Sequence, residues 1–373
     1  MSNKFFSDIQ EHSKYKHEIL KQYLPVFRKI AKFWKEFIYV DGFAGPGKYD
    51  NDTDGSPILA IKSLDLLYKN KVLTQKCNVT CIFVEVNKQN FEKLKRNIKD
   101  LEFNEKNISV TCYKGKFETV FPKIKEKYEE FNKFPSLFFL DPYGYNQIPF
   151  WIYEEIFSFK KPEVMIIFMV NYIFRFLNDQ TKYDTFCRVF GSDDWKDNFK
   201  KYCVAGISDK TEAISLFFQD LLKERTNAEY TNRYKIMHEK TNRRFYDIIH
   251  ATTHFKGLEV MKNVMFNLGI PGTFEYHGKN EGILKANKTL DKFIKTSPQI
   301  KSIENWVVTF LKNKKSLTFN ELKKIIYDNT AWIERQLREA LKNLEKNKHI
   351  EINRITSKKT GISGDDIISL RFN

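Results

Sequence analysis

Five short apolar runs alternate with amphipathic stretches over the first half of the chain, and this alternation constrains the fold more than any other feature. The amphipathic stretches carry apolar residues at three- and four-residue spacing, which is the period of a helix with one buried face. The apolar runs are short and continuous, as strands are when helices cover both faces of a parallel sheet. The sequence therefore predicts an α/β fold with a parallel sheet. The five predicted strands are Phe37–Asp41, Val79–Glu85, Ile108–Tyr113, Leu137–Asp141 and Val164–Val170.

Two further patterns flank these strands. A helical pattern covers residues 13–36, and Pro25 is expected to split or kink it because proline cannot donate the helical hydrogen bond. Two later strand-like runs, Arg233–Met237 and Phe245–Thr252, are joined by a short polar segment. Such a pair is typical of an antiparallel hairpin, so we expect the parallel sheet to end in two antiparallel strands.

The last part of the chain has a different pattern. A polar linker, residues 286–300, is followed by three helical patterns and then by two alternating strands separated by a polar turn. That order is typical of a winged helix, which is a variant of the helix-turn-helix. The sequence therefore predicts one domain over residues 1–285 and a winged-helix domain over residues 301–373.

The chain is strongly basic, with 63 Lys and Arg against 47 Asp and Glu and a net charge of +16. A field of this sign attracts phosphate polyanions, so nucleic acid, either DNA or RNA, is an expected partner. The alternative is a lysine-rich surface that only keeps the protein in solution. The predicted winged helix is itself basic, although winged helices also bind proteins. The side chains expected to contact nucleic acid are Arg335, Arg338 and Lys342 on its third helix and Lys358 and Lys359 in its turn.

The five cysteines are scattered, and several lie inside apolar runs, where a reduced thiol packs like a small hydrophobe. This favours the reducing cytoplasm, in a protein of bacterial type. No metal is expected, because Cys77 and Cys81 have no second Cys or His pair at zinc-site spacing. The longest apolar run, Val164–Val170, is too short to cross a bilayer, so we expect no membrane partner.

A glycine-rich turn follows the first predicted strand, in the sequence Y-V-D-G-F-A-G-P-G. Glycines permit positive φ and let a ligand lie against the backbone, and such a turn is where nucleotide-like cofactors bind. The dinucleotide pattern would need a third glycine at Asp50, and the chain lacks the spacing of a P-loop. The remaining D-x-F-x-G-x-G form is the one that amino-group methyltransferases use for the methionine part of S-adenosylmethionine (SAM). The residues predicted to bind SAM here are Asp41, Gly42, Phe43, Ala44, Gly45 and Gly47.

Two other side chains are predicted to contact the same cofactor. Glu85 ends the second strand, where a carboxylate is placed to accept hydrogen bonds from both ribose hydroxyls. It lies further from the glycines than is usual, and the polar loop Lys48–Gly55 accounts for the difference. Lys16, next to His17 in the N-terminal helix, is expected to cover the cofactor, although a solvated helix face is the alternative for both side chains.

The fourth predicted strand leads into Asp141, Pro142, Tyr143 and Gly144. Amino-methyltransferases have [D/N]-P-P-[F/Y/W] at this place, where the acid or amide accepts hydrogen bonds from the target amine and the aromatic ring stacks on the base. We therefore predict Asp141, Pro142 and Tyr143 as catalytic residues and Gly144 as a substrate contact. The second proline is missing and the aromatic residue comes one place early. Asn171, after the fifth strand, is predicted either to touch substrate or to cap a turn.

Several of these segments together resemble the three-Cys-motif partner protein family, over roughly residues 10–285. The resemblance implies a class I methyltransferase sheet of the Rossmann type and SAM as cofactor, and it implies a neighbour-encoded three-Cys-motif protein as a possible partner. It defines the substrate poorly. The segments that carry it are H-S-K-Y-K-H at 12–17, Y-V-D-G-F-A-G-P-G at 39–47, G-S-P at 55–57, D-P-Y-G at 141–144 and A-T-T-H-F-K-G-L-E at 251–259.

Two functions follow from these patterns. The first is a SAM-dependent methyltransferase that acts on an amino group of a nucleic-acid base, with adenine N6 favoured. Because no Pro-Cys pair occurs in the chain, the thiolate chemistry of cytosine C5 methylation is disfavoured. The second is a subunit that binds SAM and nucleic acid for its three-Cys-motif partner, with little or no methyl transfer of its own.

Overall fold

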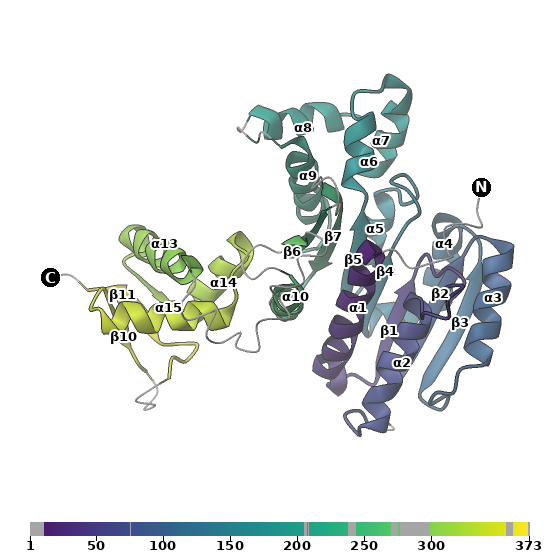
Figure 1. Ribbon diagram of the computed structural model, residues 1–373, viewed down its shortest axis with the longest axis horizontal. Helices are drawn as coiled ribbons and strands as arrows, with labels where there is room; N and C mark the ends of the chain where they lie inside the picture. Colours follow the sequence, from purple (N-terminus) through teal and green to yellow (C-terminus); the bar gives the residue numbers. More distant parts are fainter. Residues whose placement is uncertain are drawn as a thin grey trace. The chain divides into compact units, whose positions relative to one another are not determined.

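The computed structural model of the protein describes residues 11–74, 76–204, 207, 209–237, 244–269, 275–276, 298–355 and 361–371 (Figure 1). The chain forms two compact units. The first comprises Met1–Val264 with Glu275–Gly278, and the second comprises Met265–Phe274 with Lys279–Asn373. In the part of the chain that is described, no helix has the length and apolar character needed to cross a membrane.

The first unit is built on an eight-stranded sheet of order β3-β2-β1-β4-β5-β7-β6-β8. Strands β1 to β5 pair in parallel, and β7 runs antiparallel to both β5 and β6. The predicted α/β fold, a Rossmann-type parallel sheet with an antiparallel hairpin at its end, is therefore confirmed. The strands are β1 (Glu36–Asp41), β2 (Asn78–Glu85), β3 (Ile108–Lys114), β4 (Pro135–Leu140), β5 (Lys161–Phe168), β6 (Tyr230–Met237), β7 (Arg244–Thr252) and β8 (Glu275–Tyr276).

Helices cover both faces of this sheet (Figure 1). One face contributes alternate strand residues, such as Ile38 and Val40, to a core that includes side chains from α4 to α9. On the other face, the ring of Phe37 packs 5.5 Å from that of Phe27 in α1, and α1 contacts α2. The helices are α1 (Glu11–Ile30), α2 (Ser56–Lys69), α3 (Lys88–Lys99), α4 (Phe117–Lys127), α5 (Trp151–Phe157), α6 (Val170–Phe176), α7 (Tyr183–Phe190), α8 (Trp195–Val204), α9 (Lys210–Arg225) and α10 (Phe255–Leu268), with 3-10 turns at Ala31–Phe33, Glu129–Asn132 and Gln180–Lys182.

Helix α1 passes through Pro25 without a break, so of the two predicted effects the split is wrong and the kink stays a prediction. A proline inside a helix costs about 3 kcal/mol. Burial of one large apolar side chain contributes about 1.5–3 kcal/mol, and α1 buries several of them against the sheet. Packing therefore outweighs the lost hydrogen bond. The buried side chains of α1 include Ile19, Leu20, Tyr23, Leu24 and Phe27.

A buried polar cluster joins α1 to the sheet at the amino end of β5. The Tyr23 hydroxyl donates to Glu163 Oε2, and His250 Nε2 lies 2.9 Å from the same oxygen. Thr252 Oγ1 donates to Glu163 Oε1 over 3.1 Å. All four side chains are buried. Because the Glu163 carboxylate makes hydrogen-bond contacts with side chains of both α1 and β7, it holds the first helix to the central strands.

From residue 298 onward, the described part of the second unit contains three helices and a small antiparallel sheet of order β10-β11-β9. Thr318 caps the second helix, and Glu321 completes a capping box by accepting from the Thr318 backbone. The short strand β9 was not predicted from the sequence, because three residues carry too little pattern to be distinguished from a turn. The elements are, in order, α13 (Pro298–Lys314), β9 (Ser316–Thr318), α14 (Phe319–Asn329), α15 (Glu334–Lys346), β10 (Ile350–Asn353) and β11 (Ile367–Leu370).

Candidate functional site

The glycine-rich turn after β1 is held by its own backbone to both neighbouring strands. The Gly42 N–H donates to the Phe139 carbonyl of β4 over 3.0 Å, and the Ala44 N–H donates to the Val84 carbonyl of β2 over 2.9 Å. Gly45 and Gly47 adopt φ of +63° and +81°, a region that side chains disfavour. The turn therefore presents bare backbone at the carboxyl edge of the parallel strands, where ligands bind in such sheets.

Glu85 at the end of β2 lies against this turn. Its Oε2 accepts the Gly45 N–H over 2.8 Å, and its Oε1 accepts the Asn87 N–H over 2.6 Å. Burial raises the pKa of the Glu85 carboxyl, and these backbone donors oppose the increase. Each carboxylate oxygen can accept a second hydrogen bond, so Glu85 can still receive hydroxyl groups from a ligand.

A cavity of about 350 Å³ opens between the turn and the ends of β2 and β3. Its volume lies within the range of small-molecule sites, which is about 300–1,000 Å³. Gly42, Phe43 and Glu85 were predicted at this place from the sequence. The residues that follow β3 were missed, although a glycine directly after a predicted strand, Gly115, was an available signal. The full lining is Gly42, Phe43, Val84, Glu85, Val86, Gly115, Lys116, Phe117, Glu118, Asn146, Gln147 and Arg188.

Asp41, at the end of β1, is completely buried. Its Oδ1 accepts the Phe43 N–H over 3.1 Å, whereas its Oδ2 has no partner with hydrogen-bond geometry among the described residues. Burial raises the pKa of Asp41 to about 7, and the nearby carboxylates of Asp141 and Glu85 add to the increase. Hydrogen bonds from the Ser56 side chain and from the Phe43 N–H oppose this increase. Asp41 is not among the described residues that line the cavity, so its carboxylate can influence a ligand there only through its charge.

Asp141 follows β4 directly and is paired with Lys16 of α1. The Lys16 Nζ donates to Asp141 Oδ2, and the two side chains are only 13% and 16% exposed. The structure therefore places Lys16 on the predicted catalytic acid. Its assignment as a cover for the cofactor stays a prediction. The neighbouring His17 is buried, with its ring 6.0 Å from that of Tyr49, and burial lowers its pKa to about 3. A solvated helix face, the alternative for His17, is excluded.

The loop Lys48–Gly55 starts at the glycine turn and ends beside it, so that its two ends are in contact. The Gly55 N–H donates to the Gly47 carbonyl over 2.7 Å, and Lys48 pairs with Asp54 in an antiparallel bridge. Tyr49 is half-buried against α1, whereas the tip residues 50–52 are exposed. The extra residues between the glycines and Glu85 therefore form a loop that does not separate the glycine turn from β2.

The rest of the predicted substrate side lies around Asp141. Tyr143 is 68% exposed, and Gly144 adopts a φ of +116° that turns the chain after it. Asn171 is half-buried in the first turn of α6, just beyond the end of β5. The exposed ring of Tyr143 is available to stack on a base, and Asn171 lies at the same sheet edge as Asp141.

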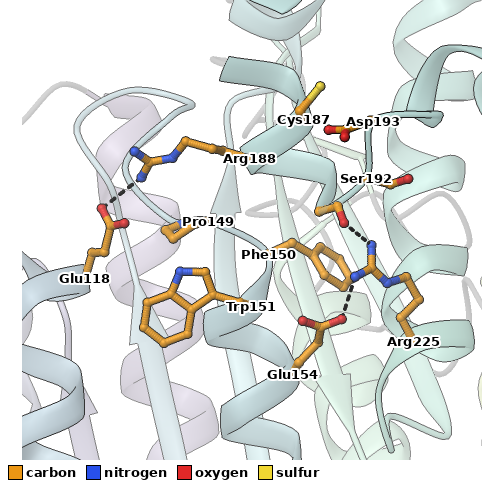
Figure 2. Close-up of a pocket in the computed structure, with 11 residues that line it drawn as sticks. Glu118, Pro149, Phe150, Trp151, Glu154, Cys187, Arg188, Ser192, Asp193 and Arg225 are labelled. Carbon is orange, nitrogen blue, oxygen red and sulfur yellow. Dashed lines mark hydrogen bonds and ion pairs between the residues drawn. The ribbon is translucent and has the colours of Figure 1, made fainter. Parts of the chain in front are cut away.

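A second, larger cavity of about 630 Å³ adjoins the first, since Glu118 and Arg188 line both (Figure 2). Here Arg188 pairs with Glu118 over 2.8 Å and Arg225 pairs with Glu154 over 2.6 Å. Arg225 also donates to the Gly191 carbonyl over 2.7 Å. Because both guanidinium groups are engaged and acidic groups are close, this cavity is a poor phosphate site. The smaller cavity, next to the glycine turn, is the stronger candidate for the cofactor.

In the second unit the predicted nucleic-acid residues differ in their surroundings. Arg335 and Lys342 are exposed on α15. Arg338 is held instead by Glu334 over 2.6 Å and by the Ile362 carbonyl over 2.6 Å, with its guanidinium 4.2 Å from the Phe319 ring centre. Arg338 therefore links α15 to Phe319 of α14 and to the backbone at Ile362, which weakens its assignment as a nucleic-acid contact. Lys358 and Lys359 lie outside the described residues.

No protein-family profile and no curated protein matches the chain. Among solved structures, it is similar to protein LPL1258 of Legionella pneumophila, of the DUF519 family, at 14% identity over 70% of this chain and 91% of that one, with a TM-score of 0.41. It is also similar to an O-methyltransferase of Bacillus cereus in complex with SAH, at 10% identity over 66% of this chain and 83% of that one, with a TM-score of 0.32. A third similar structure is a dimethyladenosine transferase of Plasmodium falciparum, at 11% identity over 89% of this chain and 96% of that one, with a TM-score of 0.27. At such low identities and TM-scores these likenesses assign no substrate to this chain.

Proposed function

We propose that the first unit binds SAM at the carboxyl edge of β1 and β2 and transfers its methyl group to an amine. The observation that carries the proposal is the cavity of about 350 Å³ bounded by the glycine turn and by Glu85. In this proposal Glu85 accepts the ribose hydroxyls and the ring of Phe117 packs on the adenine. The buried carboxylate of Asp41 attracts the ammonium of the methionine part through its charge.

The chemistry of the transfer needs little from the protein beyond placement. Bound SAM supplies an activated methyl group on a sulfonium. Asp141 accepts hydrogen bonds from the target amine, which directs the nitrogen lone pair toward the methyl group. The carboxylate then receives the proton that the amine loses. Because Lys16 holds Asp141 in the free protein, the target amine takes the place of the Lys16 ammonium at Oδ2.

Adenine N6 in DNA or RNA is the amine that we favour. The support is the exposed ring of Tyr143 beside Asp141, together with the net charge of +16. A base reaches such a pocket either from a single strand or by flipping out of a duplex. The direct test is incubation of the full chain with methyl-labelled SAM and with DNA or RNA, followed by mass spectrometry of the nucleosides. Label on adenine supports the proposal, and label found only on protein contradicts the choice of substrate.

Replacing Glu85 with alanine is expected to weaken binding of S-adenosylhomocysteine (SAH) at least about tenfold. The loss of even one charge-assisted hydrogen bond to the ribose, which contributes about 1.5–3 kcal/mol, accounts for a tenfold change. The measurement is calorimetric titration of the full chain. Glu118→Ala is the matched control, because Glu118 lines the same cavity on the helix that follows β3. Equal affinities in wild type and Glu85→Ala would remove the ribose assignment.

The affinity for SAH is expected to fall about tenfold as the pH drops from 8 to 6. The pKa of Asp41 is about 7, so its carboxylate is mostly charged at pH 8 and mostly neutral at pH 6. Only the charged form attracts the ligand ammonium, and a tenfold change follows from the ionised fractions. His17 stays neutral across this range because its pKa is about 3. In Asp41→Asn the affinity should be lower and independent of pH, and a persistent pH dependence would assign the effect to another group.

A second candidate function is suggested by the ion pair between Lys16 and Asp141. With its acceptor occupied, the isolated chain would bind SAM and nucleic acid without turnover, as a subunit for a three-Cys-motif partner. Copurification of a stable heteromer in which neither component transfers methyl groups would favour this function. Multiple-turnover methylation by the isolated chain would exclude it.

A further inference from the structure

Exposed aromatic rings gather on two segments near Asp141. Among the described residues, five aromatic rings of the first unit are more than a third exposed, namely Phe33, Tyr143, Trp151, Tyr172 and Phe174. Three of these lie close to the ends of β4 and β5: Tyr143 in the loop after β4, and Tyr172 and Phe174 on either side of the buried Ile173 in α6. Exposed aromatic rings at the sheet edge where ligands bind are candidates for substrate contacts. We define Tyr143, Tyr172, Phe174 and Arg175 as the α6 patch.

The two segments of the α6 patch pack on each other. The ring of Tyr145, two residues after Tyr143, stacks on that of Phe176 in α6 with 6.1 Å between centroids. Pro142 and Ile173 also line one small cavity together. The loop that carries Tyr143 is therefore fixed to the helix that carries Tyr172 and Phe174. Because β4 and β5 are neighbours and parallel, the patch shares the sheet edge with Asp141.

The α6 patch also carries a positive charge. The guanidinium of Arg175 lies 5.5 Å from the ring centre of Tyr172, and Arg175 makes no ion pair within the described ranges. The carboxylate that follows α6, Asp179, accepts from the backbone and hydroxyl of Thr181 over 2.9 and 2.7 Å. These hydrogen bonds hold its pKa below the usual value, so it stays an anion engaged in its own turn. Rings beside a cation that lacks an ion-pair partner suit a ligand with alternating bases and phosphates.

We propose that the α6 patch binds the nucleotides that flank the target base in a single-stranded nucleic acid. This inference rests on the proposed function, because it assumes that the target base enters at Asp141. Tyr172 and Phe174 stack on neighbouring bases, and Arg175 contacts a phosphate between them. Stacking accepts every base, so the patch gives affinity for a strand without choosing a sequence. A free nucleoside would meet only Tyr143 and Asp141.

The test uses the full chain and a fluorescent single-stranded oligonucleotide of twelve nucleotides, with binding measured by anisotropy. The double variant Tyr172→Ala/Phe174→Ala is expected to lose about tenfold or more in affinity, since each stacked base contributes about 1–3 kcal/mol. Arg175→Gln is expected to reduce the dependence of affinity on salt by about one phosphate contact. Phe33→Ala is the matched control, because Phe33 is an exposed ring that follows α1, away from the patch.

Two comparisons separate the possible outcomes. Unchanged oligonucleotide affinity in the double variant, or an equal loss in Phe33→Ala, overturns the proposal. So does sedimentation showing that the wild type is a dimer that the double variant separates, because the patch is then a contact between copies. SAH titration of the same variants checks that they are folded. If the wild type fails to bind SAH while oligonucleotide binding still depends on the patch, the proposed function fails and the patch is a single-strand binding site without a target base, which overturns the inference in its stated form.

Discussion

Replacing Asp141 with alanine is expected to lower the rate of methyl transfer at least about 100-fold, the usual contribution of a positioned acid or base. Asp141 follows β4 beside Asp41 at the end of β1, and it accepts a hydrogen bond from a cation in the free protein. Alanine removes both the acceptor that orients the target amine and the group that takes its proton. The measurement is single-turnover transfer of labelled methyl groups to nucleic acid.

Asp141→Asn is the matched variant, because an amide oxygen still accepts hydrogen bonds although it takes no proton. We expect it to keep part of the activity that Asp141→Ala loses. SAH affinity should change little in either variant, since the proposal assigns Asp141 to the target amine and not to the cofactor. A variant with wild-type turnover, or a parallel loss of SAH binding and transfer, would contradict the assignment of Asp141 to the substrate.

Replacing Glu163 with alanine is expected to lower the free energy of unfolding by about 3–5 kcal/mol, the usual result of breaking a buried charged cluster. The Glu163 carboxylate makes hydrogen-bond contacts with Tyr23, His250 and Thr252. In the variant the polar atoms of these three side chains stay buried but lose the carboxylate as a partner. Because α1 is attached through this cluster, we expect the helix to loosen first. Urea unfolding followed by circular dichroism measures the change.

Tyr23→Phe is the matched control for this cluster. It removes one hydroxyl and keeps the ring, so we expect a smaller loss of about 0.5–1.5 kcal/mol, the net contribution of a single hydrogen bond. A small loss in both variants would show that ring packing rather than the carboxylate stabilises the attachment of α1.

The sheet was predictable from the sequence because buried parallel strands leave continuous apolar runs. The predicted ends are mostly within one or two residues of the observed ones, but Val164–Val170 is really β5, which ends at Phe168, followed by the start of α6. An apolar run alone does not distinguish a buried strand from the first turn of a buried helix. The split predicted at Pro25 is wrong because tertiary packing of α1 overrides the local preference of proline.

The candidate site was predictable only in the parts that lie close together in the chain. Gly42, Phe43 and Glu85 follow strands whose order is visible in the pattern, and these three residues line one cavity. The other predicted cofactor residues of the turn, Asp41, Ala44, Gly45 and Gly47, are not among its lining residues. The pairing of Lys16 with Asp141 joins residues 125 positions apart, which no spacing rule specifies. Lys116 and Phe117 were missed because nothing in their local sequence distinguishes the cavity wall from an ordinary helix start.

The loop Lys48–Gly55 is expected to tolerate inserted residues. Since its ends meet at the hydrogen bond between Gly55 and Gly47, residues can be added at its exposed tip without moving the turn or β2. Closing a longer loop costs only about 0.6 kcal/mol for each doubling of its length. Residues 50–52 therefore offer a position for an epitope or a dye, and descendants of this chain are free to differ in length there.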